Sequence, residues 1–427
     1  MLGVSLFVFG VTNELRFLKM AERLKNRAIR PVKMAETVKK QAEIFSATAT
    51  KLPKWKFMFI NGLVLSNNVH IRPKFLQDKD CRILNPSINK KGVIKLIEKP
   101  LEVPIIIRKL SSLARRIPED HPKRKDILKE LNMRMAGYHG EESLYYFLNR
   151  IDEEKYMIFH DLRLRNGSDY FQLDFLLLTS SFAIILETKN YAGSLLFDPR
   201  TNQFSRKLDN QEITFRDPLT QAFSQVTQFQ KWVKSKKLPP LTIESLVVIS
   251  NHRTIYKVTP GNEEVYKKIC HSFAIESRLD EIFQKYPKEV LSLQDMKKLT
   301  KKLLSCHEPF SPDVLERFKI DREEITTGIF CPKCDIAPMH YQRGKWYFGK
   351  CRKMSTERYL EALEDYFLIF GPTITNAEYR RFFHFPTGNI SSKHIVALNL
   401  PYEGNKKGRR YYFPEKNLFA NPKGILL

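Results

Sequence analysis

A short hairpin near the middle of the chain places charged residues between two apolar strands. Two hydrophobic runs of strand length are separated by the small polar residues 179–181, and this pattern predicts a β-hairpin. A turn centred on these polar residues sets Asp174 opposite Glu187, and directly opposed Cβ atoms lie about 4.5–5.5 Å apart. Lys189 shares a face with Glu187, because side chains alternate along a strand. The sequence therefore predicts two carboxylates and one ammonium group together in a buried hairpin.

The burial of these charges limits what the hairpin can be. A buried charge costs several kcal/mol unless it is paired or binds a metal. Two carboxylates at this separation suit Mg²⁺, which binds proteins through one or two carboxylates and keeps several waters. A solvated and inert ion pair between Glu187 and Lys189 explains the same residues without a ligand. Both alternatives stay open on the hairpin alone.

The flanking segments predict an α/β unit around the hairpin. Glu141 follows Gly140 and is expected in the first turn of a helix, where a carboxylate is favoured. Gln221 is expected one turn into a second helix, which follows Asp217-Pro218. The predicted order is α-β-β-β-α-β, with the helices and strands at residues 136–148, 155–165, 171–178, 182–189, 220–234 and 243–250.

Four motifs in this unit resemble the nuclease-related domain (NERD), a branch of the PD-(D/E)xK nuclease superfamily. A spaced Asp and Glu-x-Lys alone occurs by chance in many chains, but the longer combination here is more specific. The resemblance covers about residues 137–258 and implies an αβββαβ core like that of restriction endonucleases. The motifs are Gly140-Glu141, Gln172-Leu173-Asp174, Leu186-Glu187-Thr188-Lys189-Asn190-Tyr191-Ala192-Gly193 and Asp217-Pro218-Leu219-Thr220-Gln221.

The resemblance implies a metal-dependent nuclease and gives each matching residue a role. Asp174 and Glu187, with Glu141 reaching in from the first helix, would hold Mg²⁺ or Mn²⁺, which activates water and neutralises phosphate charge. Lys189 would orient the attacking water or stabilise the phosphorane, and Gln221 would position substrate or water. DNA is the expected substrate, and RNA stays open. The alternative is a nucleic-acid-binding or adaptor protein whose core has lost cleavage.

Charge and hydropathy restrict the partners of the chain. There are 72 Lys and Arg residues against 47 Asp and Glu residues, a formal net charge of +25, which suits a polyanion such as DNA. An anionic membrane surface is a third alternative, but no apolar stretch approaches the roughly 20 residues of a membrane-spanning helix. Six cysteines in a chain of this length argue against a disulfide scaffold. We expect a cytoplasmic, bacterial protein with no membrane span.

A cysteine motif near the C-terminus resembles half of a zinc ribbon. Cys331-Pro332-Lys333-Cys334 forms one knuckle, and Cys351 follows a hairpin that contains a tryptophan. Phe348 stands where such a ribbon has its third cysteine. Structural Zn²⁺ has four ligands, so His340 or, less readily, Asp335 would have to substitute. A relic knuckle that packs without metal explains the same residues.

The last segment resembles a winged helix. Helical spacing at residues 359–367 and an N-cap at Thr375 predict two helices, and residues 389–392 are expected to cap a third at 393–400. In such modules one helix enters the major groove and the wing contacts the backbone. A helical cap with a solvated basic loop is the alternative. The expected nucleic-acid contacts are Lys393, His394, Lys406, Lys407, Arg409 and Arg410.

Together these patterns predict a chain of six segments. The first is rich in Lys and Arg and is expected to be poorly ordered or loosely helical. The segments are a basic extension (1–97), a helical lead-in (98–136), the nuclease-like core (137–258), a helical linker (259–325), a degenerate zinc ribbon (326–354) and a winged-helix-like module (355–427).

Overall fold

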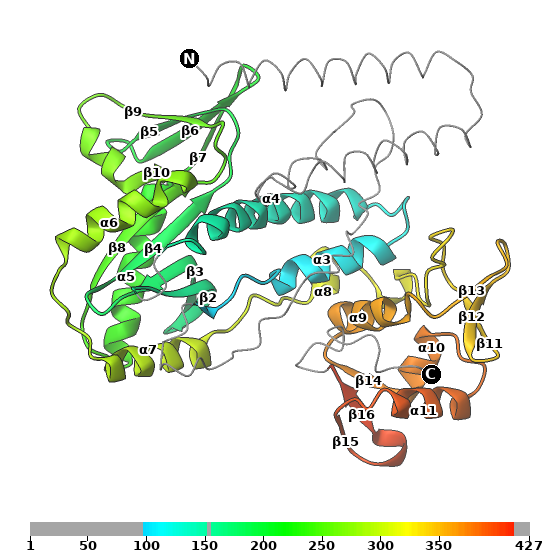
Figure 1. The fold of residues 1–427 in the computed structure, drawn as a ribbon. Helices are drawn as coiled ribbons and strands as arrows, with labels where there is room; N and C mark the ends of the chain where they lie inside the picture. The colour runs from blue at the N-terminus through cyan, green and yellow to red at the C-terminus, as the bar shows by residue number, and fades with distance from the viewer. Residues whose placement is uncertain (1–96, 152–154, 414–427) are drawn as a thin grey trace, which may run out of the picture. The chain divides into compact units, whose positions relative to one another are not determined.

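The computed structural model describes residues 97–151 and 155–413 (Figure 1). The predicted basic extension, except for residue 97, lies outside the described residues. The core contains one six-stranded sheet. Its second, third and fourth strands pair in antiparallel fashion, and all other neighbouring strands pair in parallel. In spatial order its strands are β1 (Ile97–Lys99), β2 (Met157–Asn166), β3 (Asp169–Leu178), β4 (Phe182–Lys189), β8 (Thr242–Ile249) and β10 (Ile269–His271).

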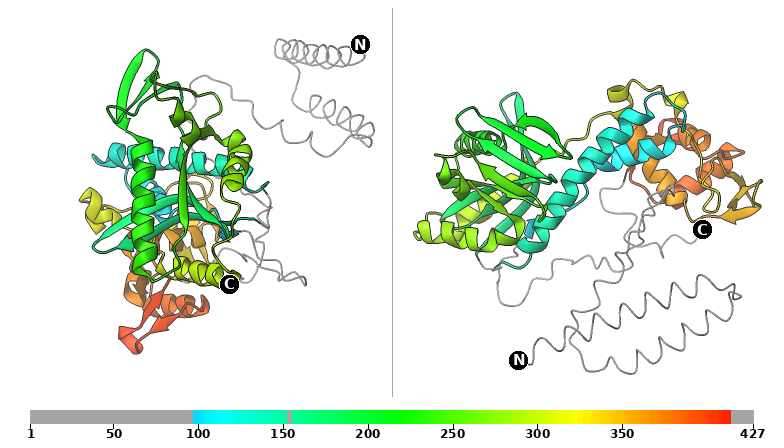
Figure 2. Two further views of the ribbon diagram at one scale, coloured as in Figure 1. Left: turned by 90° about the vertical axis from the view of Figure 1, so that its left-hand side faces the viewer. Right: turned by 90° about the horizontal axis from the view of Figure 1, so that it is seen from above.

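Helices cover both faces of this sheet (Figure 2). On one face, Leu144 and Leu148 pack with Phe175 in an apolar cluster, and on the other face Phe229 and Trp232 belong to a second cluster. No helix in the described part of the chain is long and apolar enough to span a bilayer. The described α-helices before residue 320 are α3 (Ile105–Arg116), α4 (Arg124–Leu148), α5 (Pro218–Ser235), α6 (Ile275–Lys285), α7 (Leu293–Cys306) and α8 (Val314–Phe318).

The central hairpin has the predicted register. In β3 and β4, Phe175 lies opposite Leu186 and Leu178 lies opposite Ala183, which centres the turn between residues 180 and 181. The hydroxyl of Thr179 accepts hydrogen bonds from the backbone N–H groups of Ser181 and Phe182, so a side chain closes the turn. The α-β-β-β-α-β order is confirmed by α4, β2, β3, β4, α5 and β8.

A second sheet, called the inserted sheet, was not predicted from the sequence; three of its strands lie between β4 and α5 in the chain, and the fourth follows β8. Its tight turns place Asn202, Asp209 and Asn210 at positive φ, where Asn and Asp are tolerated better than most residues. The predicted helical linker (259–325) contains α6, α7 and α8, but it also contains β10, which joins the core sheet. In spatial order the inserted sheet contains β7 (Gln211–Arg216), β6 (Gln203–Leu208), β5 (Ser194–Asp198) and β9 (Ile255–Val258).

A single long helix leads into the core. α4 spans 25 residues, so Glu141 lies in its interior, and the prediction that Glu141 occupies a first helical turn is wrong. Gly140 lies where α4 crosses the ends of β4 and β8. A Cβ added there would lie 2.7 Å from Asn190 Cβ and 2.8 Å from Ser250 Oγ. Gly140 therefore permits a close approach of the helix to the sheet.

Two glycines of α4 provide a test of this packing. At Gly137 a Cβ would meet nothing within 4 Å, and alanine is about 1 kcal/mol better than glycine in a helix. Gly137→Ala should therefore raise the free energy of unfolding by about 0.5–1 kcal/mol, whereas Gly140→Ala should lower it by about 1–3 kcal/mol through overpacking. Urea denaturation of both variants measures the difference, and equal effects would contradict the close approach of α4.

The C-terminal part of the described chain, residues 329–413, has its own apolar core, in which Trp346, Tyr379 and Phe383 are fully buried. Thr375 is the N-cap of a helix, as predicted. The cap predicted at residues 389–392 is wrong, because Thr387 caps that helix. The elements are β11 (His340–Gln342), β12 (Lys345–Phe348), β13 (Lys353–Ser355), α9 (Tyr359–Phe370), β14 (Thr373–Thr375), α10 (Asn376–Phe382), α11 (Gly388–Ala397), β15 (Tyr402–Glu403) and β16 (Arg410–Tyr412).

Candidate functional site

The predicted acidic and basic residues meet where β3, β4 and α5 come together. Glu187 Oε1 accepts a hydrogen bond of 2.5 Å from Lys189 Nζ, and Lys189 Nζ also donates to Gln221 Oε1 at 3.2 Å. Asp174 Oδ2 accepts from the backbone N–H of Thr188 at 2.9 Å. The carboxylate of Glu141 on α4 interacts electrostatically with Asp174, Glu187 and Lys189. All five predicted side chains therefore belong to one polar cluster.

Burial and neighbouring negative charges raise the pKa values of Asp174 and Glu141 in this cluster. Burial, followed by the charges of Glu187 and Glu141, raises the pKa of Asp174 well above its usual value. Burial, followed by Asp161 and Glu187, raises the pKa of Glu141 to about 8. For Lys189, burial lowers the pKa, but the carboxylates outweigh this effect and the net shift is upward. The lysine is therefore an ammonium ion at neutral pH, and it does not relieve all of the repulsion among the acids.

The donor set suits a hard divalent cation. Carboxylate oxygens are the ligands preferred by Mg²⁺ and Mn²⁺, and a cation beside Glu141 and Asp174 would favour their ionised forms and so oppose the rise in their pKa values. Within residues 97–151 and 155–413, only a group of three cysteines brings three ligand atoms within 4.8 Å of one another. The carboxylates of Glu141, Asp174 and Glu187 do not form such a group, so they would have to draw together around an ion. By chemistry these residues fit Mg²⁺ or Mn²⁺.

Gln225 also belongs to the site, although sequence reasoning assigned only Gln221. Its Nε2 donates to Glu187 Oε2 at 2.6 Å and to the carbonyl oxygen of Gln172 at 3.0 Å. The side chain is buried and lies one helical turn after Gln221. The available signal was the i, i+4 spacing of the two glutamines, which places them on one face of a helix.

A second group of residues, on β1 and β2, surrounds Glu141 and was not predicted from the sequence. His160 Nε2 lies 2.6 Å from Glu141 Oε2, and burial lowers the pKa of His160 to about 4, so its imidazole is neutral at pH 7. Lys99 Nζ donates to the carbonyl oxygen of His160 at 2.7 Å. Asp161 follows His160 at a φ of 51° and falls opposite Asp174 in the β2–β3 register. The site therefore contains a fourth carboxylate and a second lysine.

The predicted nucleic-acid contacts lie on α11, on the segment that joins β15 and β16, and at the start of β16. Lys393, Lys406 and Arg410 are exposed, and the guanidinium of Arg409 lies 4.2 Å from the ring centroid of Tyr402. The side chain of Lys407 lies outside the described residues. The assignment of a contact to His394 is wrong, because that side chain is buried and its Nδ1 lies 2.6 Å from the hydroxyl of Tyr379.

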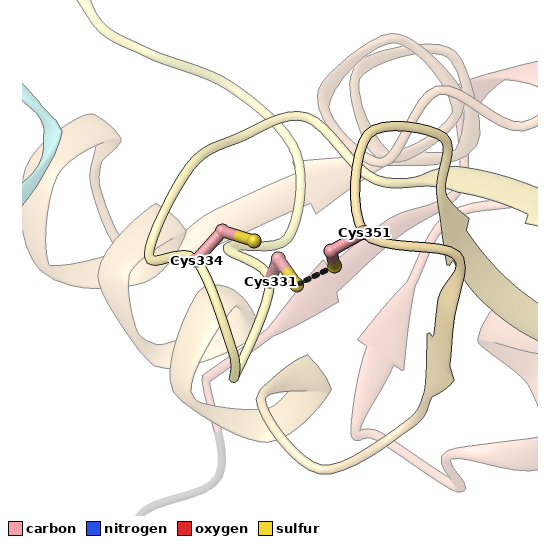
Figure 3. Close-up of side chains that lie close together, drawn as sticks. All are labelled: Cys331, Cys334 and Cys351. Carbon is pink, nitrogen blue, oxygen red and sulfur yellow. Dashed lines mark hydrogen bonds between the residues drawn. The ribbon is translucent and has the colours of Figure 1, made fainter.

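The cysteines of the predicted knuckle meet at a second site (Figure 3). Cys331, Cys334 and Cys351 bring their Sγ atoms within 4.8 Å of one another, and the sulfurs of Cys331 and Cys351 are 3.5 Å apart. The two residues expected to complete a zinc site do not belong to this group of three ligands. Asp335 forms an ion pair with Arg358, and His340 is an exposed residue of β11.

Comparison with known proteins agrees with the geometry of the core. Residues 136–250 match the family model of the nuclease-related domain, and this interval contains all five predicted site residues. An uncharacterized protein of Bacillus anthracis is 21% identical over 140 residues, which cover 33% of this chain and 63% of that protein. The chain therefore spans less than two thirds of the length of that relative. No solved structure matches the chain. Residues 136–250 form a nuclease-related domain.

Proposed function

We propose that the protein is a metal-dependent nuclease that hydrolyses phosphodiester bonds in DNA. The main support is the group formed by Glu141, Asp174, Glu187 and Lys189, in which one buried and two half-buried carboxylates outnumber the neighbouring cation. An excess of buried negative charge is costly in a folded protein. Such an excess of negative charge is expected at a site that binds a divalent ion, because the bound ion would neutralise it. The match to the nuclease-related domain supports the same reaction.

Three acids would hold Mg²⁺ or Mn²⁺ in this reaction. Glu141, Asp174 and Glu187 supply the carboxylate ligands, and His160 and Gln225 fix two of them in place. When bound, the ion would polarise the scissile phosphate and lower the pKa of a bound water. The hydrogen bonds from His160 and Gln225 restrict the orientations of Glu141 and Glu187. Less side-chain entropy is then lost when an ion binds, which should raise the affinity for the ion.

Lys189 would act as a fixed positive charge beside the phosphate. Its ammonium group is held between Glu187 and Gln221, and its raised pKa makes it a poor general base at neutral pH. It would therefore orient the attacking water and stabilise the charge of the phosphorane. Gln221 would position the ammonium group and the water through its amide.

The C-terminal elements would bind the substrate outside the nuclease core. The order α9, β14, α10, α11, β15 and β16, with β16 between β14 and β15, supports the proposal that these elements form a winged helix. Lys393, Lys406 and Arg410 are exposed there, and α11 would lie in the major groove with the wing on the backbone. Because such contacts release counterions, DNA affinity should fall steeply with salt.

An assay of plasmid DNA tests the proposal. The full chain should nick or linearise the plasmid with Mg²⁺ or Mn²⁺, and EDTA should stop the reaction. An RNA substrate of the same length, assayed in parallel, decides between DNA and RNA. Salt-sensitive DNA binding without cleavage in any divalent ion would contradict the nuclease proposal and favour the nucleic-acid-binding alternative.

A further inference from the structure

Three cysteines outside the nuclease-related domain form a ligand set of a different chemical kind. Cys331 is buried, and Cys334 and Cys351 are partly exposed. We propose that these three side chains bind one Zn²⁺ as thiolates and leave its fourth coordination position open to an exogenous ligand. This site is independent of the proposed nuclease chemistry.

Two separate turns bring the three sulfurs together, as Figure 3 shows. The first turn is held by hydrogen bonds from Asp335 N to the Cys331 carbonyl oxygen at 2.8 Å and from Cys331 N to the Ile336 carbonyl oxygen at 2.9 Å. The second turn joins β12 to β13 and contains Cys351. Backbone hydrogen bonds hold the first turn, and the pairing of β12 with β13 flanks the second, so the protein backbone brings the cysteines together.

The spacing of the sulfurs fits a single ion. A tetrahedral zinc with bonds of about 2.3 Å places its sulfurs about 3.8 Å apart, and the sulfurs of Cys331 and Cys351 are 3.5 Å apart. Cys334 completes a triangle in which no pair exceeds 4.8 Å, and small side-chain rotations close that gap. Thiolates favour Zn²⁺ strongly over Mg²⁺, so this site and the carboxylate cluster select different metals.

The fourth position has no protein ligand among the described residues. Phe348 stands three residues before Cys351, where a fourth cysteine would complete the set, and it is buried in the apolar core of the C-terminal part. In the part of the chain that the structure describes, no histidine, aspartate, glutamate or further cysteine joins the three sulfurs. Since Cys334 and Cys351 are partly exposed, water or a small anion can reach the ion from solvent.

The metal content of the purified full chain tests the ligand set. We expect about one Zn²⁺ per chain, and at least a fivefold lower content in Cys334→Ser and Cys351→Ser. Cys306→Ser is the matched control, because Cys306 is also partly buried but lies on α7 outside the set, and it should keep its zinc. A zinc-free wild-type protein, with or without a Cys331–Cys351 disulfide detected by thiol counting, would overturn the proposal.

The open position is tested with Co²⁺ in place of Zn²⁺. The visible spectrum of the cobalt protein should shift when imidazole or a small thiol is added. Phe348→Cys should supply a fourth thiolate and abolish this response. If that variant does not fold, the wild-type titration alone decides, because a cobalt spectrum that ignores both added ligands would show that the fourth position is already filled by the protein.

Discussion

Asp174→Asn is expected to lower the rate of DNA cleavage by about 1,000-fold or more. The substitution removes one of three carboxylates proposed to hold the divalent ion, and an ion that polarises the phosphate and water supplies several kcal/mol of transition-state stabilisation. Asparagine keeps an oxygen that can accept the hydrogen bond from Thr188 N, so the hairpin should be retained. Single-turnover cleavage at saturating Mg²⁺ measures the loss.

The stability of this variant separates a lost ligand from a damaged fold. The pKa of Asp174 is raised in the folded protein, so at pH 7 its ionised form costs folding free energy relative to the unfolded chain. The neutral amide does not carry this cost, and the metal-free variant should be as stable as the wild type or more stable. Asp198→Asn, which changes an aspartate of β5 outside the site, should cleave at the wild-type rate. Wild-type cleavage by Asp174→Asn would contradict the assigned role.

Asp365→Ala is expected to lower the free energy of unfolding by about 3–5 kcal/mol, the cost of leaving a buried charge unpaired. Asp365 on α9 pairs with Arg116 on α3 at 2.7 Å, and the two side chains are 1% and 0% exposed. Arg116 also donates to the carbonyl oxygens of Thr326 and Gly328, both at 3.0 Å. Without the aspartate, the buried guanidinium keeps only neutral acceptors. Thermal or urea unfolding measures the loss.

The neighbouring residue supplies a matched control. Glu364 pairs with Arg108 between the same two helices, but this pair is 25% and 33% exposed. Glu364→Ala should lower the free energy of unfolding by less than about 1 kcal/mol, as is usual for solvated ion pairs. The double variant Arg116→Met with Asp365→Ala should recover much of the lost stability, because no unpaired charge remains. Equal losses for Asp365→Ala and Glu364→Ala would contradict the importance of the buried pair.

The sequence predicts the central hairpin well because a short turn fixes the register of both strands. The polar residues 179–181 allow one centre for the turn, and a shift of one residue would turn every apolar side chain to the wrong face. Asp174, Glu187 and Lys189 follow directly from this register. The β2–β3 turn lies at Gly167-Ser168 and sets Asp161 opposite Asp174, whereas a turn centred one residue earlier, on Asn166-Gly167, would have set Phe159 there, so the fourth carboxylate could not be found in this way.

Other features depend on contacts between distant segments and have little local signal. Gly140 resembles a helix boundary in sequence, but in the structure it allows α4 to approach Asn190 and Ser250. Lys99 joins the site because β1 pairs with β2, which nothing near residue 99 indicates. The buried position of His394 depends on Tyr379, which packs against it from another helix. Tertiary packing decides each of these positions.

Anomalous scattering from crystals soaked in Mn²⁺ tests the central claim most directly. The claim predicts one peak about 2.0–2.3 Å from carboxylate oxygens of Glu141, Asp174 and Glu187, with Lys189 beside it, and no such peak in Asp174→Asn crystals. A wild-type crystal with no peak among these three acids, from protein that still cleaves DNA in Mn²⁺, would contradict it.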